Sequence, residues 1–287
     1  MKTLSEFLKD FKLNWKVTKK SLFYKFKNRV KTSDWFGLVR SDNGVNLGIC
    51  KGVYEPVQNS ELLKTLLKIG KDLGFELKTG GYINQGEKTY FFLENPEPLT
   101  IGKDTIIRSI FALNSHDRSQ MVSFGYANKV LSCQNQFNKF YNNSKFQFKH
   151  SKSAKNKMAQ IPFNFQQYLK VQQRVEEIFK KFVNTPIKDN LIKDLTIYLF
   201  ELEKKDPQEY STRLKNKLHA FKSAINHEIN SKGSNLWGLF NGVTYYTNHK
   251  TKFSNKKHNS ALDSIYCGAG YTLSNKAFEY LAKVVSL

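Results

Sequence analysis

The sequence predicts an α+β fold, with an antiparallel sheet and packed helices in the N-terminal half and a helical C-terminal half. Two patterns support this prediction. Between Trp35 and Phe124, short apolar runs are separated by turn-forming Gly, Asn and Asp residues, as in strands joined by short connections. After Pro162, apolar residues recur every three or four positions, which is helical spacing. With 40% hydrophobic residues, the 287-residue chain can form a large core.

Residues 1–32 form a basic N-terminal arm that is rich in lysine. Leu4, Phe7, Leu8 and Phe11 fall at helical spacing, so we expect a short amphipathic helix followed by a looser segment. The arm could grip phosphates or reach a neighbouring subunit. A flexible, solvated terminus is the alternative.

Residues 33–128 are expected to be rich in sheet. A helix capped by Ser60 interrupts the strands, and a turn at Asn84-Gln85-Gly86 predicts a hairpin between Tyr82 and Tyr90. The expected strands are Phe36–Arg40, Leu47–Val53, Glu76–Ile83, Lys88–Leu93, Thr105–Leu113 and Met121–Tyr126.

Residues 129–287 are expected to be helical. Asp206 and Pro207 are suited to the start of one of these helices, as its cap and its first residue. No internal repeat or long linker is evident, so residues 33–287 are predicted to form a single α+β domain. The expected helices are Lys129–Tyr141, a helix that follows Pro162, Leu191–Glu203, Pro207–Asn230 and Leu273–Val285.

The formal net charge of +22 predicts a polyanionic partner. Three widely spaced cysteines do not suggest a disulfide framework, so a reducing compartment is expected. We see no secretory signal and no apolar stretch near the roughly 20 residues that span a bilayer. A cytoplasmic protein without a membrane partner is therefore expected.

The segment Gln134–Lys157 combines lysines with aromatic residues. Lysines neutralise phosphates and flat rings stack on unpaired bases, so the combination favours single-stranded nucleic acid. In the alternative, Phe137, Phe140 and Tyr141 form the buried face of a helix. Phe146 and Phe148 alternate with polar residues and are the better candidates for stacking. The residues predicted to bind nucleic acid are Arg108, Arg118, Lys129, Lys139, Lys145, Phe146, Phe148, Lys149, His150, Lys152, Lys155, Lys157, Lys250 and Lys252.

A second set of residues predicts a polar site. Asn114–Arg118 follows an expected strand, where His116 and Asp117 could bind a metal or transfer a proton. The chain has few clustered carboxylates, and Asp and Asn after a strand often hold a turn instead. No histidine pair has ligand-like spacing, so we expect no metal. The predicted polar-site residues are Asn114, His116, Asp117, Asn135, Asn241 and His249.

The chain contains no phosphate-binding GxxxxGK[ST] loop and no GxSxG hydrolase motif. We therefore expect a protein that is not an enzyme and needs no cofactor. A nuclease or nucleotide-processing enzyme centred on Asn114–Arg118 is the first alternative. The second alternative is a counter-defence or regulatory protein that binds a host protein.

An ordered set of motifs resembles the phage- and plasmid-associated "domain of unknown function" family numbered nine-three-two. Differences from the family pattern include Arg118-Ser119 in place of Gly-Ser and Ser151 in place of Thr. The run from Asn128 to Gln136 also differs. The motifs are YEPVQN (Tyr54–Asn59), KTYFFLEN (Lys88–Asn95), NSHDRS (Asn114–Ser119), LSCQNQF (Leu131–Phe137), His150 and WGLFNGVTYYTNH (Trp237–His249).

The resemblance implies a mobile element in a bacterial host. In that setting, a basic α+β protein of this size is similar in kind to the phage single-strand annealing proteins of the RecT, Redβ and Erf groups and to Rad-fifty-two. This analogy of fold implies binding of single-stranded DNA, strand annealing in recombination, and assembly into rings or filaments. Duplex DNA and RNA stay open as partners.

Overall fold

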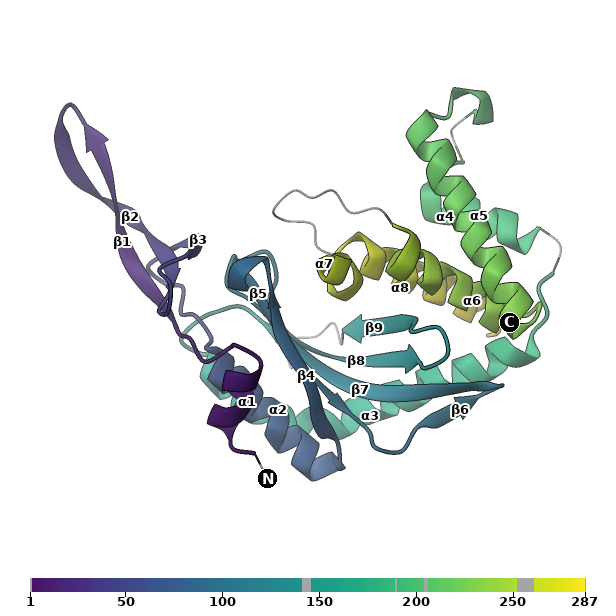
Figure 1. Ribbon diagram of the computed structural model, residues 1–287, viewed down its shortest axis with the longest axis horizontal. Coiled ribbons are helices and arrows are strands. Elements are labelled where there is room, and N and C mark those ends of the chain that lie inside the picture. The colour runs from purple at the N-terminus through teal and green to yellow at the C-terminus, as the bar shows by residue number, and fades with distance from the viewer. Residues whose placement is uncertain (1, 141–145, 189, 204–205, 252–260, 287) are drawn as a thin grey trace. The chain divides into compact units, whose positions relative to one another are not determined.

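The computed structural model describes residues 2–140, 146–188, 190–203, 206–251 and 261–286. The α+β class predicted from the sequence is confirmed, with antiparallel strands in the N-terminal half and helices in the C-terminal half (Figure 1). The chain divides into two compact units, where the sequence pattern favoured one composite domain. Unit 1 consists of residues 1–96, 109–126 and 140–169, and unit 2 of residues 97–108, 127–139 and 170–287.

Unit 1 contains two antiparallel sheets. The smaller sheet has the strand order β1-β2-β3, formed by Val17–Phe26, Arg29–Arg40 and Asn46–Lys51. The larger sheet has the order β10-β8-β7-β5-β4. Its strands are β4 (Glu76–Ile83), β5 (Lys88–Glu94), β7 (Asp104–Ser115), β8 (Val122–Val130) and β10 (Gln147–Phe148).

The predicted hairpin between β4 and β5 is confirmed. Tyr82 pairs with Thr89 in this antiparallel ladder. A 3₁₀ turn, η1 (Asn84–Gly86), joins the two strands, and Gln85 adopts a positive φ of 60° there. The turn residues recognised in the sequence therefore set the register of the hairpin.

Two helices of unit 1 precede the larger sheet in sequence. The short amphipathic helix expected near the N-terminus is α1 (Leu4–Asp10), whose Thr3 and Glu6 form a capping box. Helix α2 (Asn59–Leu73) begins two residues earlier than expected, because Gln58 and not Ser60 is its N-cap and forms a capping box with Glu61. Its buried residues include Leu62, Leu63, Leu66 and Ile69, as the sequence spacing indicates.

Unit 2 is mainly helical. Strand β6 (Leu99–Ile101) pairs with the beginning of β7, and β9 (Gln136–Phe140) pairs with β8. The rings of Phe137, Phe179, Phe240 and Phe278 contact one another at centroid distances of 5.1–6.0 Å and form its aromatic core. The helical elements are α4 (Leu191–Phe200), η2 (Pro207–Glu209), α5 (Thr212–Lys232), α6 (Leu236–Tyr245), the π-helical turn η3 (Tyr246–Lys250), α7 (Ala261–Tyr266) and α8 (Ala269–Val284).

Three sequence predictions of local structure were wrong. Residues 17–26, assigned to a loose arm, form β1. The helix expected at Lys129–Tyr141 is instead the end of β8 and β9, because Gln134 takes a left-handed conformation (φ 58°) and turns the chain. Helix α3 (Ala154–Asn184) begins eight residues before Pro162, with buried Ala154, Met158 and Ile161 on its first turns.

The expected helix Pro207–Asn230 is split. Asp206 does cap a helical segment, since its side chain accepts a hydrogen bond from the Gln208 amide, but that segment is the short η2. Ser211 caps the following α5 through the amide of Leu214. In the parts of the chain that the structure describes, no helix has both the length and the apolar character needed to cross a membrane.

Gly80 in β4 permits close packing of α1 on the larger sheet. A Cβ atom added at Gly80 would lie 2.6 Å from the Phe11 ring and 2.8 Å from the Phe91 ring. We predict that Gly80→Ala lowers the free energy of unfolding by about 1–3 kcal/mol, because the two rings must move apart. Urea denaturation will measure the change.

Gly52→Ala is the matched control, because an added Cβ there would make only an ordinary contact with Phe36 at 3.8 Å. We expect it to change stability by less than about 0.5 kcal/mol. Equal denaturation midpoints for the two variants would contradict the packing described for Gly80.

Candidate nucleic-acid interface

Strands β1 and β2 form a long two-stranded ribbon at one end of the smaller sheet (Figure 1). Phe26 pairs with Arg29 at its tip, so only Lys27 and Asn28 form the turn. Both turn residues have positive φ values, 46° and 61°, as a two-residue turn that matches the strand twist requires. Asn tolerates this conformation better than most residues, so Asn28 suits the turn.

The ribbon near its tip exposes large apolar side chains. Phe23 is 64% exposed, Tyr24 52% and Phe26 51%. Val30 on the opposite strand is also exposed. Two strands without a covering layer have no interior, and exposed rings in such numbers usually indicate a binding surface.

Each face of the ribbon carries both aromatic and basic side chains. Tyr24 is paired with Lys31 and Phe26 with Arg29, and directly paired residues share a face. Side chains alternate along a strand, so Phe23 and Lys25 lie on the opposite face. Rings and cations are therefore mixed on both faces rather than separated.

Several lysines lie over aromatic rings of the smaller sheet. The Lys27 and Lys31 ammonium groups are 5.5 and 5.2 Å from the centroid of Phe26. Lys51 on β3 lies 5.4 Å from the ring centroid of Trp35, which is also exposed. These contacts place a positive charge beside a flat apolar surface, which is the combination that binds a phosphate and an unpaired base.

The sequence analysis predicted this combination in another segment, and the structure contradicts the prediction for two of its rings. Phe146 and Phe148, predicted to stack on bases, are 0% and 2% exposed and belong to the core of unit 1. The Phe146 ring contacts Phe165 of α3 at a centroid distance of 6.0 Å. Alternation with polar residues indicated a strand whose rings face inward, and the sequence pattern could not determine which side was covered.

The predicted basic segment Gln134–Lys157 is divided between the two units. Its residues up to Lys139 belong to unit 2 and those from Phe140 onward to unit 1. The Lys139 side chain, Lys145 and Lys252 lie outside the described residues. Exposed cations of unit 1 from the predicted set are Arg118, Lys149, Lys152, Lys155 and Lys157. In unit 2, Arg108 and Lys129 are half-buried and Lys250 is exposed.

Arg118 and Arg108 both donate to backbone carbonyls. Arg118 Nη1 lies 2.9 Å from the carbonyl oxygen of Ile49, and Arg108 Nη2 lies 3.1 Å from that of Glu97. Lys250 is 5.5 Å from the ring centroid of Tyr245, which also contacts the predicted site residue His249 at 4.9 Å. His249 is exposed, and partial desolvation lowers its pKa.

The predicted polar site divides between the two units. In unit 1, Asn114 and His116 are completely buried beside Asn59 of α2. The Asn59 Oδ1 atom accepts a hydrogen bond from Thr89 and lies 3.2 Å from His116 Nε2. Because an amide oxygen only accepts, the contact with Asn59 is a hydrogen bond in the tautomer that carries its proton on Nε2.

His150, predicted to contact nucleic acid, belongs to the same buried cluster. Its Nδ1 atom accepts a hydrogen bond from the Val57 amide at 3.1 Å, and its ring stacks on Tyr54 at 4.8 Å. Asn114 donates to the Val57 carbonyl at 2.8 Å. Both backbone polar groups of Val57 are thus held by side chains from motifs more than 50 residues away in sequence. With 6% exposure, His150 is not a surface contact.

Asp117 holds a turn rather than facing solvent as a catalytic acid. Its carboxylate accepts hydrogen bonds from the Ser115 and Ser119 hydroxyls and from the Ser119 amide. The neighbouring His116 ring is enclosed by Trp15, at a centroid distance of 5.6 Å. In this arrangement Asn114–Arg118 connects strands and loops, and its histidine is completely buried.

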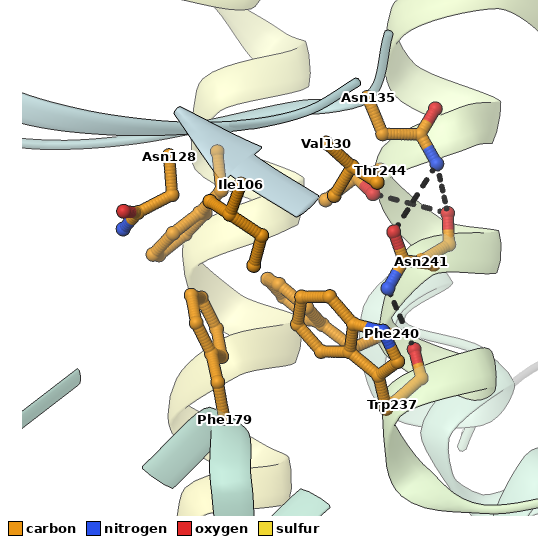
Figure 2. Close-up of a pocket in the computed structure, with 10 residues that line it drawn as sticks. Ile106, Asn128, Val130, Asn135, Phe179, Trp237, Phe240, Asn241 and Thr244 are labelled. Carbon is orange, nitrogen blue, oxygen red and sulfur yellow. Dashed lines mark hydrogen bonds between the residues drawn. The ribbon is translucent and has the colours of Figure 1, made fainter. Parts of the chain in front are cut away.

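In unit 2, Asn135 of LSCQNQF meets Asn241 of α6. Asn135 Nδ2 lies 3.2 Å from the Asn241 carbonyl oxygen, and Asn241 donates to the Trp237 carbonyl at 2.9 Å (Figure 2). The cavity that these residues line has a volume of about 10 Å³. It has room for about one water and none for an organic ligand.

A buried ion pair is formed by residues that are close in sequence to those lining the cavity. Asp104 accepts hydrogen bonds from Lys232 at 2.6 Å and from the Trp237 indole at 2.7 Å. Burial raises the pKa of Glu228, one helical turn before Lys232. These contacts join α5 and α6 to the beginning of β7. Across the residues that the structure describes, no three His, Cys, Asp or Glu side chains are grouped so that they could hold a metal ion.

The buried histidines make unit 1 sensitive to acid. Burial lowers the pKa of His116 from 6.5 to about 3, with a further contribution from His150 and Arg40, and burial alone lowers that of His150 to about 4. The unfolded chain therefore binds more protons between these values and 6.5, and stability falls as pH decreases through that range. At pH 5 each buried histidine is expected to lower the free energy of unfolding by on the order of 2 kcal/mol relative to pH 8.

His150→Gln tests this assignment, because the glutamine oxygen can still accept from Val57 while the titrating group is removed. We expect a shallower loss of stability in urea titrations between pH 6.5 and 4, whereas exposed His219→Gln leaves the slope unchanged. In the unaltered protein, NMR titration should show His150 neutral at pH 5. A His150 resonance that titrates near 6.5 would refute the burial argument.

Comparison with known proteins gives one match. No curated protein and no solved structure matches the chain. The sequence model of one family matches residues 46–266, which is most of the chain and contains Tyr54–Asn59, Asn114–Ser119, His150 and Trp237–His249. The ribbon of β1 and the tip of β2 precedes the matched stretch. The chain belongs to the family described as Domain of unknown function (DUF932).

Proposed function

We propose that this protein binds single-stranded nucleic acid, with single-stranded DNA as the preferred ligand. The observation that carries the proposal is the exposed ribbon, where Phe23, Tyr24 and Phe26 alternate with cations. Lys19, Lys20, Lys25, Lys27, Arg29 and Lys31 lie in the same ribbon, and no acidic residue occurs between Lys16 and Lys31.

The mixture of charge and rings favours nucleic acid over an apolar protein partner. Burying the ribbon against an apolar surface would remove at least three cations from water, at a large free-energy cost. A polyanion neutralises those charges and releases counterions on binding. The formal charge of +22 supports the same class of ligand.

The rings favour a single strand over a duplex. Stacking on a side chain needs an accessible base face, which a paired and stacked duplex does not offer. Lys27 and Lys31 flank the Phe26 ring, so a base on this ring would have a cation within reach of its phosphate. Double-stranded DNA is expected to bind only through its phosphates.

Strand annealing by an oligomer is part of the proposal. A chain held by its phosphates and by some base faces keeps other base edges available for pairing. Two ribbons in an assembly could then bring complementary strands together. The burial of His116 and the turn role of Asp117 give no support to a nuclease site at Asn114–Arg118.

Substitution of the ribbon rings tests the proposal. We expect Tyr24→Ala and Phe26→Ala each to weaken binding of a fluorescein-labelled oligo-dT by about 5- to 150-fold, which corresponds to roughly 1–3 kcal/mol per stacked base. Fluorescence anisotropy at several salt concentrations will measure the dissociation constants. Lys27→Gln and Lys31→Gln should instead reduce the salt dependence of binding. The slope of log K against log salt concentration should become smaller in magnitude by about 0.7 for each phosphate that the variant no longer neutralises.

Phe163→Ala is the matched control. Phe163 is 77% exposed on α3 and has the Lys68 ammonium 4.9 Å from its ring centroid, like Phe26 in the ribbon. We expect this variant to bind as the unaltered protein does. Equal effects at Phe163 and Phe26, or no salt-dependent binding of oligo-dT by the unaltered protein, would contradict the proposal. A ribbon variant that changes only the oligomeric mass would assign the rings to self-association.

A further inference from the structure

A groove in unit 1 lies beside the base of the ribbon. It has a volume of about 650 Å³, within the range of small-molecule binding sites. Its walls come from the beginning of β1, from the loop that precedes α2, and from the first residues of α3. The lining residues are Val17, Thr18, Lys19, Glu55, Pro56, Val57, Gln58, Glu61, Ser151, Lys152, Ala154 and Lys155.

Hydrogen bonds from motif residues hold the walls of this groove in place. The Gln58 side chain binds both backbone groups of Val17, accepting from its amide at 2.9 Å and donating to its carbonyl at 3.0 Å. Val57 is held in the same way by His150 and Asn114. The groove is therefore built by YEPVQN, NSHDRS and His150, which all fall in the matched part of the chain.

Two lysines of the groove are held in ion pairs of different exposure. Lys19, whose side chain is 25% exposed, is 3.1 Å from Glu55 and donates to the Gly52 carbonyl at 2.9 Å. Lys155 is 3.1 Å from Glu61. The Lys155 side chain is 76% exposed, so its ion pair is weak and readily replaced. Lys152 has no ion pair among the residues that the structure describes. Glu61 already accepts from the Gln58 amide in the capping box and stays satisfied without Lys155.

The groove adjoins the base of the ribbon. Lys19 lines the groove, and Phe23 and Lys25 follow it along β1, past a register irregularity between Ser21 and Phe23. The four steps along β1 from Lys19 to Phe23 span about 13 Å. At about 3.4 Å or more for each stacked nucleotide, a strand of roughly four nucleotides would cover that length.

We propose that this groove binds phosphate groups of a single strand whose bases stack on the ribbon. The inference rests on the proposed function and assigns to the DUF932 part of the chain, together with Lys19 of β1, the role of positioning the backbone. Lys152, Lys155 and Lys19 bind phosphate oxygens, and Glu55 competes for Lys19. Removing the Glu55 charge should therefore strengthen binding, whereas removing lysines should weaken it.

Anisotropy titrations of fluorescein-labelled oligo-dT test the groove with two kinds of variant, one expected to strengthen binding and one expected to weaken it. We expect Glu55→Gln to bind about threefold more tightly, a change of the size of an exposed ion pair. The variant that combines Lys152→Gln and Lys155→Gln should bind more weakly. Its slope of log K against log salt concentration should be smaller in magnitude by about 1.4, because two phosphates are no longer neutralised. Both effects should be larger for a 12-mer than for a 3-mer, which cannot reach from the ribbon into the groove.

Matched controls come from an ion pair outside the groove. Glu76 and Lys78 on β4 form an exposed pair at 2.8 Å, so Glu76→Gln makes the same charge change as Glu55→Gln. Tighter binding by Glu55→Gln than by Glu76→Gln supports the groove. Equal binding by those two variants, with no effect of the lysine substitutions, overturns it.

Two further outcomes separate this inference from the proposed function. Loss of binding in the ribbon variants without any change in the groove variants overturns the groove and leaves the proposed function standing. Absence of oligo-dT binding by the unaltered protein refutes the proposed function itself. A third arm uses dTMP: if lysine substitutions abolish dTMP binding but leave the 12-mer unaffected, the groove is a mononucleotide site and the inference is wrong.

Discussion

The ribbon of β1 and β2 depends on one constraint, which is that two strands alone cannot bury their side chains. Beyond the part of the sheet paired with β3, both faces are open, and Phe23, Tyr24 and Phe26 stay exposed. Stability there comes from the backbone ladder and from cross-strand pairs such as Tyr24 with Lys31. Because these rings contribute so little to the core, we propose that they bind a ligand and that the cations beside them select its class.

Buried polar groups organise the part of unit 1 that adjoins this ribbon. Val57 and Val17 have their backbone groups bonded to His150, Asn114 and Gln58, so the loop before α2 has a fixed shape. Removing one partner would leave a buried polar group unsatisfied, which costs more than the bond itself contributes. His116 and Asn114 therefore resemble catalytic residues in sequence, although in the structure they connect elements through buried hydrogen bonds. Their polar groups bond to other groups inside the protein.

Much of the fold could be predicted from the sequence, and the proposed binding surface could not. The α+β class, β4, β5 and their hairpin follow from turn residues and apolar periodicity, because both patterns are local. Phe146 and Phe148 show the limit of this reasoning. Alternation indicates a strand, but only the packing of Phe165 against Phe146 determines which face is covered. The ribbon was not predicted because the frequent lysines obscured the alternation of polar and apolar residues in β1, although Asn28 indicated a turn.

The most direct test of the central claim is photo-crosslinking of a halogenated single-stranded oligonucleotide, with the attached peptides identified by mass spectrometry. If bases stack on the ribbon, crosslinks will occur at Phe23, Tyr24 or Phe26 and will disappear when salt releases the strand. Crosslinks confined to unit 2, or to Phe163 on α3, would contradict the assignment of the ribbon as the nucleic-acid interface.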